Sequence, residues 1–98
     1  MSDVAFLEQL QAIIRDRIAT APEGSYTARL AAAGVLKVAQ KVGEEGVELA
    51  LAAAAQDRAR VTSEAADLLY HLLLLLELRE LSLSDVIDEL ERRHRGGA

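Results

Sequence analysis

Two groups of acidic residues have spacings that could bring several carboxylates to one point. Glu44, Glu45 and Glu48 form the pattern E-E-x-x-E, and Glu64 and Asp67 form E-x-x-D further along the chain. Residues three or four positions apart share a face of a helix, so each group would project its carboxylates together. If two antiparallel helices faced each other here, the carboxylates would repel unless cations lay between them. Hard cations such as Mg²⁺ or Mn²⁺ suit such a site.

The same residues have a simpler interpretation. A glutamate-rich helix is commonly a solvated surface with salt bridges four residues apart, and Lys41 and Glu45 have that spacing. Each motif alone fits this interpretation, whereas both motifs on consecutive helices, next to apolar residues, favour a metal site. His71 lies one turn after Asp67 and is a candidate ligand, although a packed histidine beside the ligands is the preferred interpretation.

The composition indicates packed helices rather than sheets. The chain has 98 residues, of which 51% are hydrophobic and only 3% aromatic, with a single proline. We expect one domain, residues 1–98, near the lower size limit for a self-sufficient core, so that an oligomer would add buried area. The net charge of −5 argues against a nucleic-acid-binding surface, and the absence of cysteine removes thiolate chemistry and suits a reducing cytoplasm.

Hydrophobic periodicity and capping residues predict an all-α bundle of four to five helices. The expected helices are a first one capped by Ser2 or Asp3 and ending near Ala19, a short one over 26–33 between Ser25 and Gly34, a long one over 35–55, a third long one capped by Asp57 and ending near Glu80, and a last one from the Ser82–Asp85 capping box to about Arg93. Residues 94–98 would form a frayed tail.

The most hydrophobic stretch, Leu68–Leu76, predicts a buried helix rather than a membrane span. It is far shorter than the ~20 residues that a spanning helix needs, and Asp67 and Glu77 bracket it. Its helix is apolar nearly all round, which is typical of a central element or a subunit interface. Because the N-terminal residues also lack the pattern of a signal peptide, we expect a cytoplasmic protein without a membrane partner.

Three segments carry a resemblance to a known family. They are SYTARL over 25–30, KVAQKVGEEGVE over 37–48 and SEAADLLYHLLLLL over 63–76. Together they resemble the phosphoribosyl-ATP pyrophosphatases, which belong to the all-α, MazG-like nucleotide pyrophosphohydrolases, and the likeness extends from the first helix to residue 94. The two carboxylate motifs mark the superfamily, whereas SYT-x-x-L, QKVGEE and SEAADLLYH are typical of the phosphoribosyl-ATP enzymes. Gly46 replaces the alanine usual in relatives but removes no ligand.

The resemblance implies Mg²⁺-dependent hydrolysis of phosphoribosyl-ATP to phosphoribosyl-AMP and pyrophosphate, the second step of histidine biosynthesis. It implies metal ligands at Glu45, Glu48, Glu64 and Asp67, with Glu44 as an additional ligand or base candidate. We expect Glu44 or Glu45 to accept the proton of the attacking water. The resemblance also implies a homodimer or higher assembly of intertwined helices. The phosphoribosyl-AMP cyclohydrolase of the next step would be a separate protein that makes at most transient contact.

Two roles stay open for the residues around the carboxylates. Candidates for contacts to the triphosphate or the phosphoribosyl group are Lys37, Lys41 and Arg29. Candidates for hydrogen bonds to ribose or phosphate are Ser25, Tyr26 and Thr27. Places beside the metal ligands are expected for Gln40 and His71. Alternatively, the lysines pair with glutamates, and residues 25–29 are a capped turn with an exposed arginine. Two other functions also stay open: a house-cleaning pyrophosphatase of the same fold, acting on dUTP, dCTP or a damaged nucleotide, and a non-enzymatic helical module.

Overall fold

The structure is a computed structural model that describes residues 3–96, and within that range every regular element is an α-helix. The expected all-α fold is therefore confirmed. The helices are α1 (Phe6–Thr20), α2 (Tyr26–Ala33), α3 (Val35–Ala54), α4 (Arg58–Leu78) and α5 (Leu83–Arg95). No helix in this range is both long and apolar enough to cross a membrane.

Three predicted helix starts have the expected side-chain caps. Ser25 Oγ accepts the Ala28 N–H at 3.1 Å, and an Asp57 carboxylate oxygen accepts the Arg60 N–H at 3.1 Å. The capping box at α5 is complete. Gly34 separates α2 from α3 with φ of 101°, a left-handed conformation that side chains disfavour. These short-range signals fix where the chain turns.

The first helix begins later than its expected cap. Asp3 accepts the Ala5 N–H at 2.9 Å in a turn that precedes the helix, and α1 starts at Phe6 without a side-chain cap. Ser2, the other predicted cap, lies outside the described residues. A carboxylate satisfied by a local turn is no longer free to cap a helix two residues away.

The last helix is longer than expected. The prediction that the chain frays from residue 94 is wrong for His94 and Arg95, which belong to α5, and residues 97 and 98 lie outside the described range. Basic side chains in a last turn favour the helix C-terminus, and Arg92 and Arg93 both pair with Glu89. These interactions explain the two additional helical residues.

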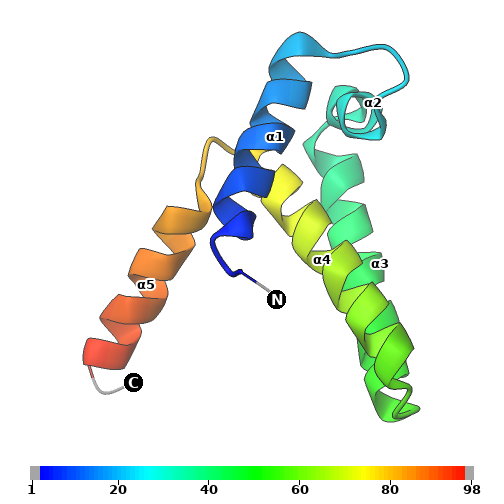
Figure 1. Cartoon of the computed structure of the whole chain (residues 1–98), viewed down its shortest axis with the longest axis vertical. Coiled ribbons are helices and arrows are strands. Elements are labelled where there is room, and N and C mark those ends of the chain that lie inside the picture. Colours follow the sequence, from blue (N-terminus) through cyan, green and yellow to red (C-terminus); the bar gives the residue numbers. More distant parts are fainter. Residues whose placement is uncertain (1–2, 97–98) are drawn as a thin grey trace.

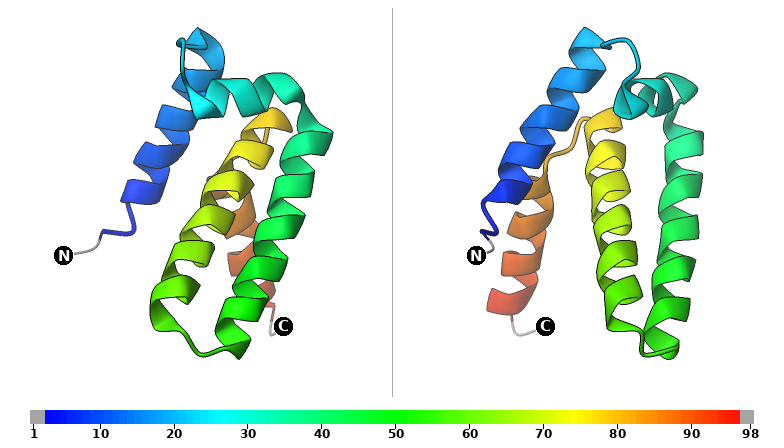
Figure 2. Two further views of the ribbon diagram at one scale, coloured as in Figure 1. Left: turned by 90° about the vertical axis from the view of Figure 1, so that its right-hand side faces the viewer. Right: turned by 45° about the vertical axis from the view of Figure 1, so that its right-hand side comes forward.

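Helices α3 and α4 form a long antiparallel hairpin, which all views show side by side (Figures 1 and 2). The short helix α2 lies across the end of the hairpin away from its turn, and α1 packs against α4 near the same end. The largest buried cluster sits there and consists of Ile14, Leu30, Val38, Leu73 and Leu74. One end of the hairpin is thus held in the core.

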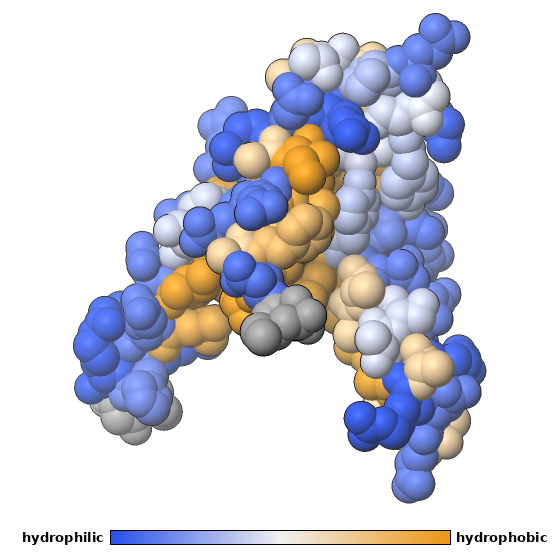
Figure 3. All heavy atoms as spheres, in the orientation of Figure 1, coloured by the Kyte–Doolittle hydropathy of each residue, from blue (hydrophilic) through white to orange (hydrophobic). Residues whose placement is uncertain are grey.

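Helix α5 diverges from the hairpin and forms the second leg of an inverted V (Figure 1). It contributes no buried residue, and Ile87 and Leu90 are 44% and 57% exposed. Hydrophobic residues gather on the inner side of this leg and beside α1 (Figure 3). Phe6 and Ile13 of α1 are exposed as well, at 51% and 41%. An apolar surface of this extent is typical of an interface.

Candidate active site

Three of the predicted carboxylates meet between α3 and α4. One oxygen from each of Glu45, Glu48 and Glu64 lies within 4.8 Å of one oxygen of the other two. Glu45 and Glu48 are one turn apart on α3, and Glu64 projects from the facing turn of α4. Asp67 is exposed one turn further along α4, where its negative charge acts on both Glu45 and Glu64. The antiparallel hairpin therefore brings the two sequence motifs together.

Two oxygens of this cluster are buried without a hydrogen-bond partner in the described structure. They are Glu45 Oε2 and Glu64 Oε2, and the Glu45 side chain is only 8% exposed. Burial raises the pKa of Glu45, and the charges of Glu48 and Asp67 raise it further. Burial also raises the pKa of Glu64, and the hydrogen bond and charge of Glu48 raise it further. These clustered oxygens have unpaired lone pairs and repel one another, so they fit a hard divalent cation. Such an ion would accept the lone pairs and offset the repulsion.

The other polar residues of α3 lie at different distances from this cluster. Lys41 Nζ lies 3.9 Å from Glu45 Oε1, in an ion pair whose lysine is 32% exposed and whose glutamate is 8% exposed. Glu44 is exposed and accepts a hydrogen bond from Gln40 Nε2 at 3.3 Å. The side chains of Glu44 and Gln40 thus interact with each other outside the group of Glu45, Glu48 and Glu64.

His71 connects the carboxylates to α2. Its Nδ1 lies 2.8 Å from the carbonyl oxygen of Asp67 and 3.7 Å from Glu45 Oε1, and its Nε2 lies 2.7 Å from the Tyr26 hydroxyl. A carbonyl oxygen only accepts, so Nδ1 carries a proton, and in the neutral ring Nε2 accepts a hydrogen bond that the Tyr26 hydroxyl donates. The ring is 6% exposed and packs edge-on against Tyr26 and Tyr70. His71 is therefore a buried side chain that links α4 to α2 beside Glu45.

A second pair of side chains joins the same two helices. The Thr27 hydroxyl forms a hydrogen bond with the Tyr70 hydroxyl, and Thr27 is almost fully buried. Neighbouring residues on α2 thus bond to neighbouring residues on α4: Tyr26 to His71 and Thr27 to Tyr70. The sequence alone did not predict this pairing. Two adjacent polar residues in each helix indicated that the helices could be linked by hydrogen bonds, but they did not specify which residues bond to which.

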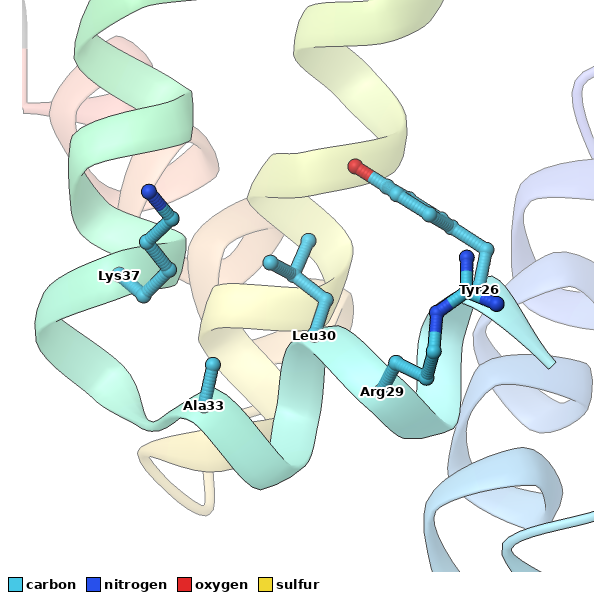
Figure 4. Close-up of a pocket in the computed structure, with 5 residues that line it drawn as sticks. All are labelled: Tyr26, Arg29, Leu30, Ala33 and Lys37. Atoms are coloured by element: carbon cyan, nitrogen blue, oxygen red, sulfur yellow. The ribbon is translucent and has the colours of Figure 1, made fainter. Parts of the chain in front are cut away.

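The exposed side of α2 forms a small pocket with the start of α3 (Figure 4). The pocket has a volume of about 160 Å³ and is lined by Tyr26, Arg29, Leu30, Ala33 and Lys37. Lys37 and Arg29 lie on opposite sides of Leu30, and the Tyr26 hydroxyl points toward α4. Three residues that were candidates for substrate contacts therefore line one surface. Ser25 and Thr27 instead use their hydroxyls within the fold.

Comparison with known proteins gives one family. The family model described as phosphoribosyl-ATP pyrophosphohydrolase matches residues 7–94. The chain is 53% identical over 90 residues to the histidine biosynthesis bifunctional proteins HisIE of Salmonella typhi and Escherichia coli (strain K12), covering 92% of the chain and 44% of each protein. It is also 53% identical over 93 residues to that of Yersinia pestis, covering 95% and 46%. The chain thus spans less than half the length of these relatives.

Proposed function

Because the chain belongs to the phosphoribosyl-ATP pyrophosphohydrolase family, we propose that it hydrolyses phosphoribosyl-ATP to phosphoribosyl-AMP and pyrophosphate in histidine biosynthesis. Besides the family match, one observation carries the proposal: Glu45, Glu48 and Glu64 meet, and within residues 3–96 a buried oxygen of Glu45 and one of Glu64 have no hydrogen-bond partner. A purely solvated acidic surface does not bury a carboxylate, because desolvation of an unpaired charge is costly.

The proposal includes Mg²⁺, or Mn²⁺ in its place, held by Glu45, Glu48, Glu64 and Asp67. Such ions, when bound, neutralise phosphate oxygens and lower the pKa of a coordinated water. The chain contributes the fixed spacing of the carboxylates, which comes from the antiparallel packing of α3 and α4. Because Glu45 is only 6% exposed, competing water is limited and its electrostatic interactions are strengthened.

Glu44 and Glu45 are the two candidates for the base that accepts a proton from the attacking water. Glu45 is buried, and its raised pKa makes it a stronger proton acceptor than an ordinary carboxylate. Glu44 is exposed and linked to Gln40, so it is free of the cluster. Replacing each with glutamine at saturating Mg²⁺ distinguishes them, because loss of the base lowers kcat. Near-wild-type turnover in both variants would contradict the assignment.

The substrate would lie along the face formed by α2 and the first half of α3. We assign direct contacts to Tyr26, Arg29, Lys37 and Lys41, whose polar groups border the pocket or the carboxylates. Ser25 and Thr27 hold α2 in place through their bonds to Ala28 and Tyr70, so their contribution is to position the others. An Arg29→Ala variant with unchanged KM would count against the contact assigned to Arg29.

The proposed enzyme is a cytoplasmic homodimer or higher homo-oligomer. The exposed apolar side chains of α1 and α5 support an assembly, because a soluble monomer rarely exposes so many together. A stable and active monomer in sedimentation would contradict this part of the proposal. A transient contact with phosphoribosyl-AMP cyclohydrolase, which would receive the product, is tested by co-sedimentation of the two proteins during turnover.

The deciding experiment measures pyrophosphate release from phosphoribosyl-ATP with Mg²⁺ and with EDTA, alongside dUTP, dCTP and ATP. We expect rapid, Mg²⁺-dependent turnover of phosphoribosyl-ATP and little turnover of the others. Turnover of a deoxynucleotide in its place would keep the carboxylate site but replace the biosynthetic role with a house-cleaning one. No turnover of any compound would return the carboxylates to a structural role.

A further inference from the structure

The pocket between α2 and α3 contains two cationic side chains without acidic partners. Arg29 and Lys37 line its two sides, and within residues 3–96 neither forms an ion pair. Lys41, one turn after Lys37, differs because it lies 3.9 Å from Glu45. In a chain with a net charge of −5, two unpaired cations facing one small pocket indicate an anion-binding site.

The chemistry of the lining favours a phosphate on a sugar rather than a free carboxylate or a bare inorganic ion. Arginine and lysine together provide a planar fork and a point charge for phosphate oxygens. Leu30 and Ala33 provide an apolar surface between them, and the Tyr26 ring adds a wall that a sugar can pack against. The Tyr26 hydroxyl is held by His71, which keeps this wall in place.

The position of the pocket relative to the carboxylates fits a substrate with two separate phosphate groups. Lys37 precedes Glu45 by eight residues on the same helix. At 1.5 Å per residue, this corresponds to about 12 Å along the helix axis. One phosphate group cannot occupy both places, whereas a nucleotide with a second phosphorylated sugar on the far side of its base extends over such a distance.

We propose that the Arg29–Lys37 pocket binds the single phosphate of the phosphoribosyl group, while the triphosphate lies at the carboxylates. This inference rests on the proposed function and adds the basis of its substrate selectivity. ATP and deoxynucleoside triphosphates carry no second phosphate, so they reach the carboxylates without the binding energy of the pocket. Selectivity then arises from α2 and the start of α3, away from the residues that carry out the hydrolysis.

The test removes the phosphate from the substrate and the charge from the protein, singly and together. The full chain with Mg²⁺ is assayed with phosphoribosyl-ATP and with ribosyl-ATP, the analogue that lacks the 5′-phosphate. Arg29→Gln and Lys37→Gln are compared with wild type, and Arg60→Gln, an exposed arginine near the hairpin turn, is the matched control. Where ribosyl-ATP is not hydrolysed, its inhibition constant against phosphoribosyl-ATP replaces kcat/KM.

We expect each pocket variant to lower kcat/KM for phosphoribosyl-ATP about 10- to 100-fold, the loss typical of a charged hydrogen bond. The value for ribosyl-ATP should change less than about threefold, because the group that the cations bind is already missing. The control should leave both values unchanged. Equal losses for both substrates would overturn the proposal, since they would indicate a general effect on the site.

Binding of ribose 5-phosphate in EDTA separates this inference from the proposed function. Wild type and Arg60→Gln should bind it, and Arg29→Gln and Lys37→Gln should bind it at least tenfold more weakly. If wild type does not hydrolyse phosphoribosyl-ATP but shows this binding pattern, the proposed function fails and the phosphosugar pocket stands. If wild type hydrolyses phosphoribosyl-ATP but binding does not depend on the two cations, the pocket assignment fails alone.

Discussion

The α3–α4 hairpin and helix α5 use their hydrophobic and charged residues in opposite ways. The hairpin buries charge: Glu45 and Glu64 each have a buried oxygen without a hydrogen-bond partner among the described residues. Helix α5 exposes apolar surface: it has no buried residue, and Ile87 and Leu90 are largely exposed. Both arrangements are unfavourable in an isolated chain without ligands.

The difference between the two regions indicates what completes each one. In our proposal, a cation and the substrate complete the carboxylate cluster, and another protein surface covers the exposed apolar helix. We therefore expect substitutions in the carboxylate cluster of the hairpin to change activity without lowering stability. Substitutions on α5 should change assembly and stability first.

The largest effect is expected from Glu45→Gln in the hairpin. The glutamine keeps the shape of the side chain but removes a ligand charge and one candidate base, so kcat should fall roughly 10²- to 10⁴-fold. The thermal unfolding temperature without metal should stay equal or rise, because a repelled, buried charge is lost. Steady-state kinetics and thermal unfolding in EDTA measure both.

The matched control for this prediction is Glu91→Gln on α5. Glu91 is exposed, and its only described ion pair, with Arg95 at 4.0 Å, is at the surface. Such pairs contribute little, so activity should remain within about twofold of wild type. If Glu45→Gln unfolded the protein while Glu91→Gln did not, Glu45 would be a structural residue and the division between the regions would fail.

The next effect is expected from Leu90→Asp on α5. Burying a leucine in an interface contributes about 1.5–3 kcal/mol, so each copy replaced should weaken association roughly 10- to 100-fold. Analytical ultracentrifugation over a dilution series should show a smaller species at a concentration where wild type stays assembled. Asp88→Asn, an exposed position on the same helix, should sediment like wild type.

A smaller effect is the pH dependence of stability without metal. The folded-state pKa values of Glu45 and Glu64 are raised above the ordinary 4.5. Their contribution to stability is thus fully present below the unfolded pKa and is lost as pH rises through the folded pKa. Glu45→Gln should therefore gain stability relative to wild type as pH increases from about 4.5 toward neutrality, as measured by urea unfolding in EDTA.

Two comparisons make this pH prediction specific. Glu23→Gln, an exposed loop variant, should show the same pH dependence as wild type. Adding Mg²⁺ at neutral pH should reduce the advantage of Glu45→Gln, because a cation offsets the repulsion in wild type. A stability difference that does not change with pH would mean that the Glu45 carboxylate has the same pKa in both states.

The sequence predicted the fold closely because the signals at most helix ends are local. Ser25, Gly34, Asp57 and Ser82 each act on groups within a few residues, so their effects do not depend on the rest of the chain. The prediction failed at the first helix, where Asp3 bonds within a turn. It could not place α5 relative to the hairpin, since an amphipathic pattern identifies the apolar face but not the surface that covers it.

The candidate site was predictable in its α3–α4 part and less so in its α2 part. The spacing of Glu45 and Glu48 fixes a shared helix face, and a short turn forces α4 to run back past it, which brings Glu64 alongside. The bond between Tyr26 and His71 joins residues 45 positions apart. No periodicity specifies such a contact, because it depends on how α2 crosses the hairpin. The predicted metal and its ligand set stay predictions.

The smallest effect is expected at the start of α5, where Ser82→Ala removes one half of the capping box. Ser82 Oγ accepts the Asp85 N–H at 3.1 Å, and an Asp85 carboxylate oxygen accepts the Ser82 N–H at 2.8 Å. The substitution keeps the second bond and the bond from the Leu83 N–H to Gln11, so it should cost about 1 kcal/mol of unfolding free energy. Activity should not change at concentrations where the protein stays assembled, because α5 carries no residue of the carboxylate cluster.

Urea unfolding of Ser82→Ala beside Ser84→Ala, an exposed serine in the same first turn, measures the difference in unfolding free energy. An equal loss in both variants would mean that the cap does not hold α5, and that its packing in the assembly alone determines where the helix begins.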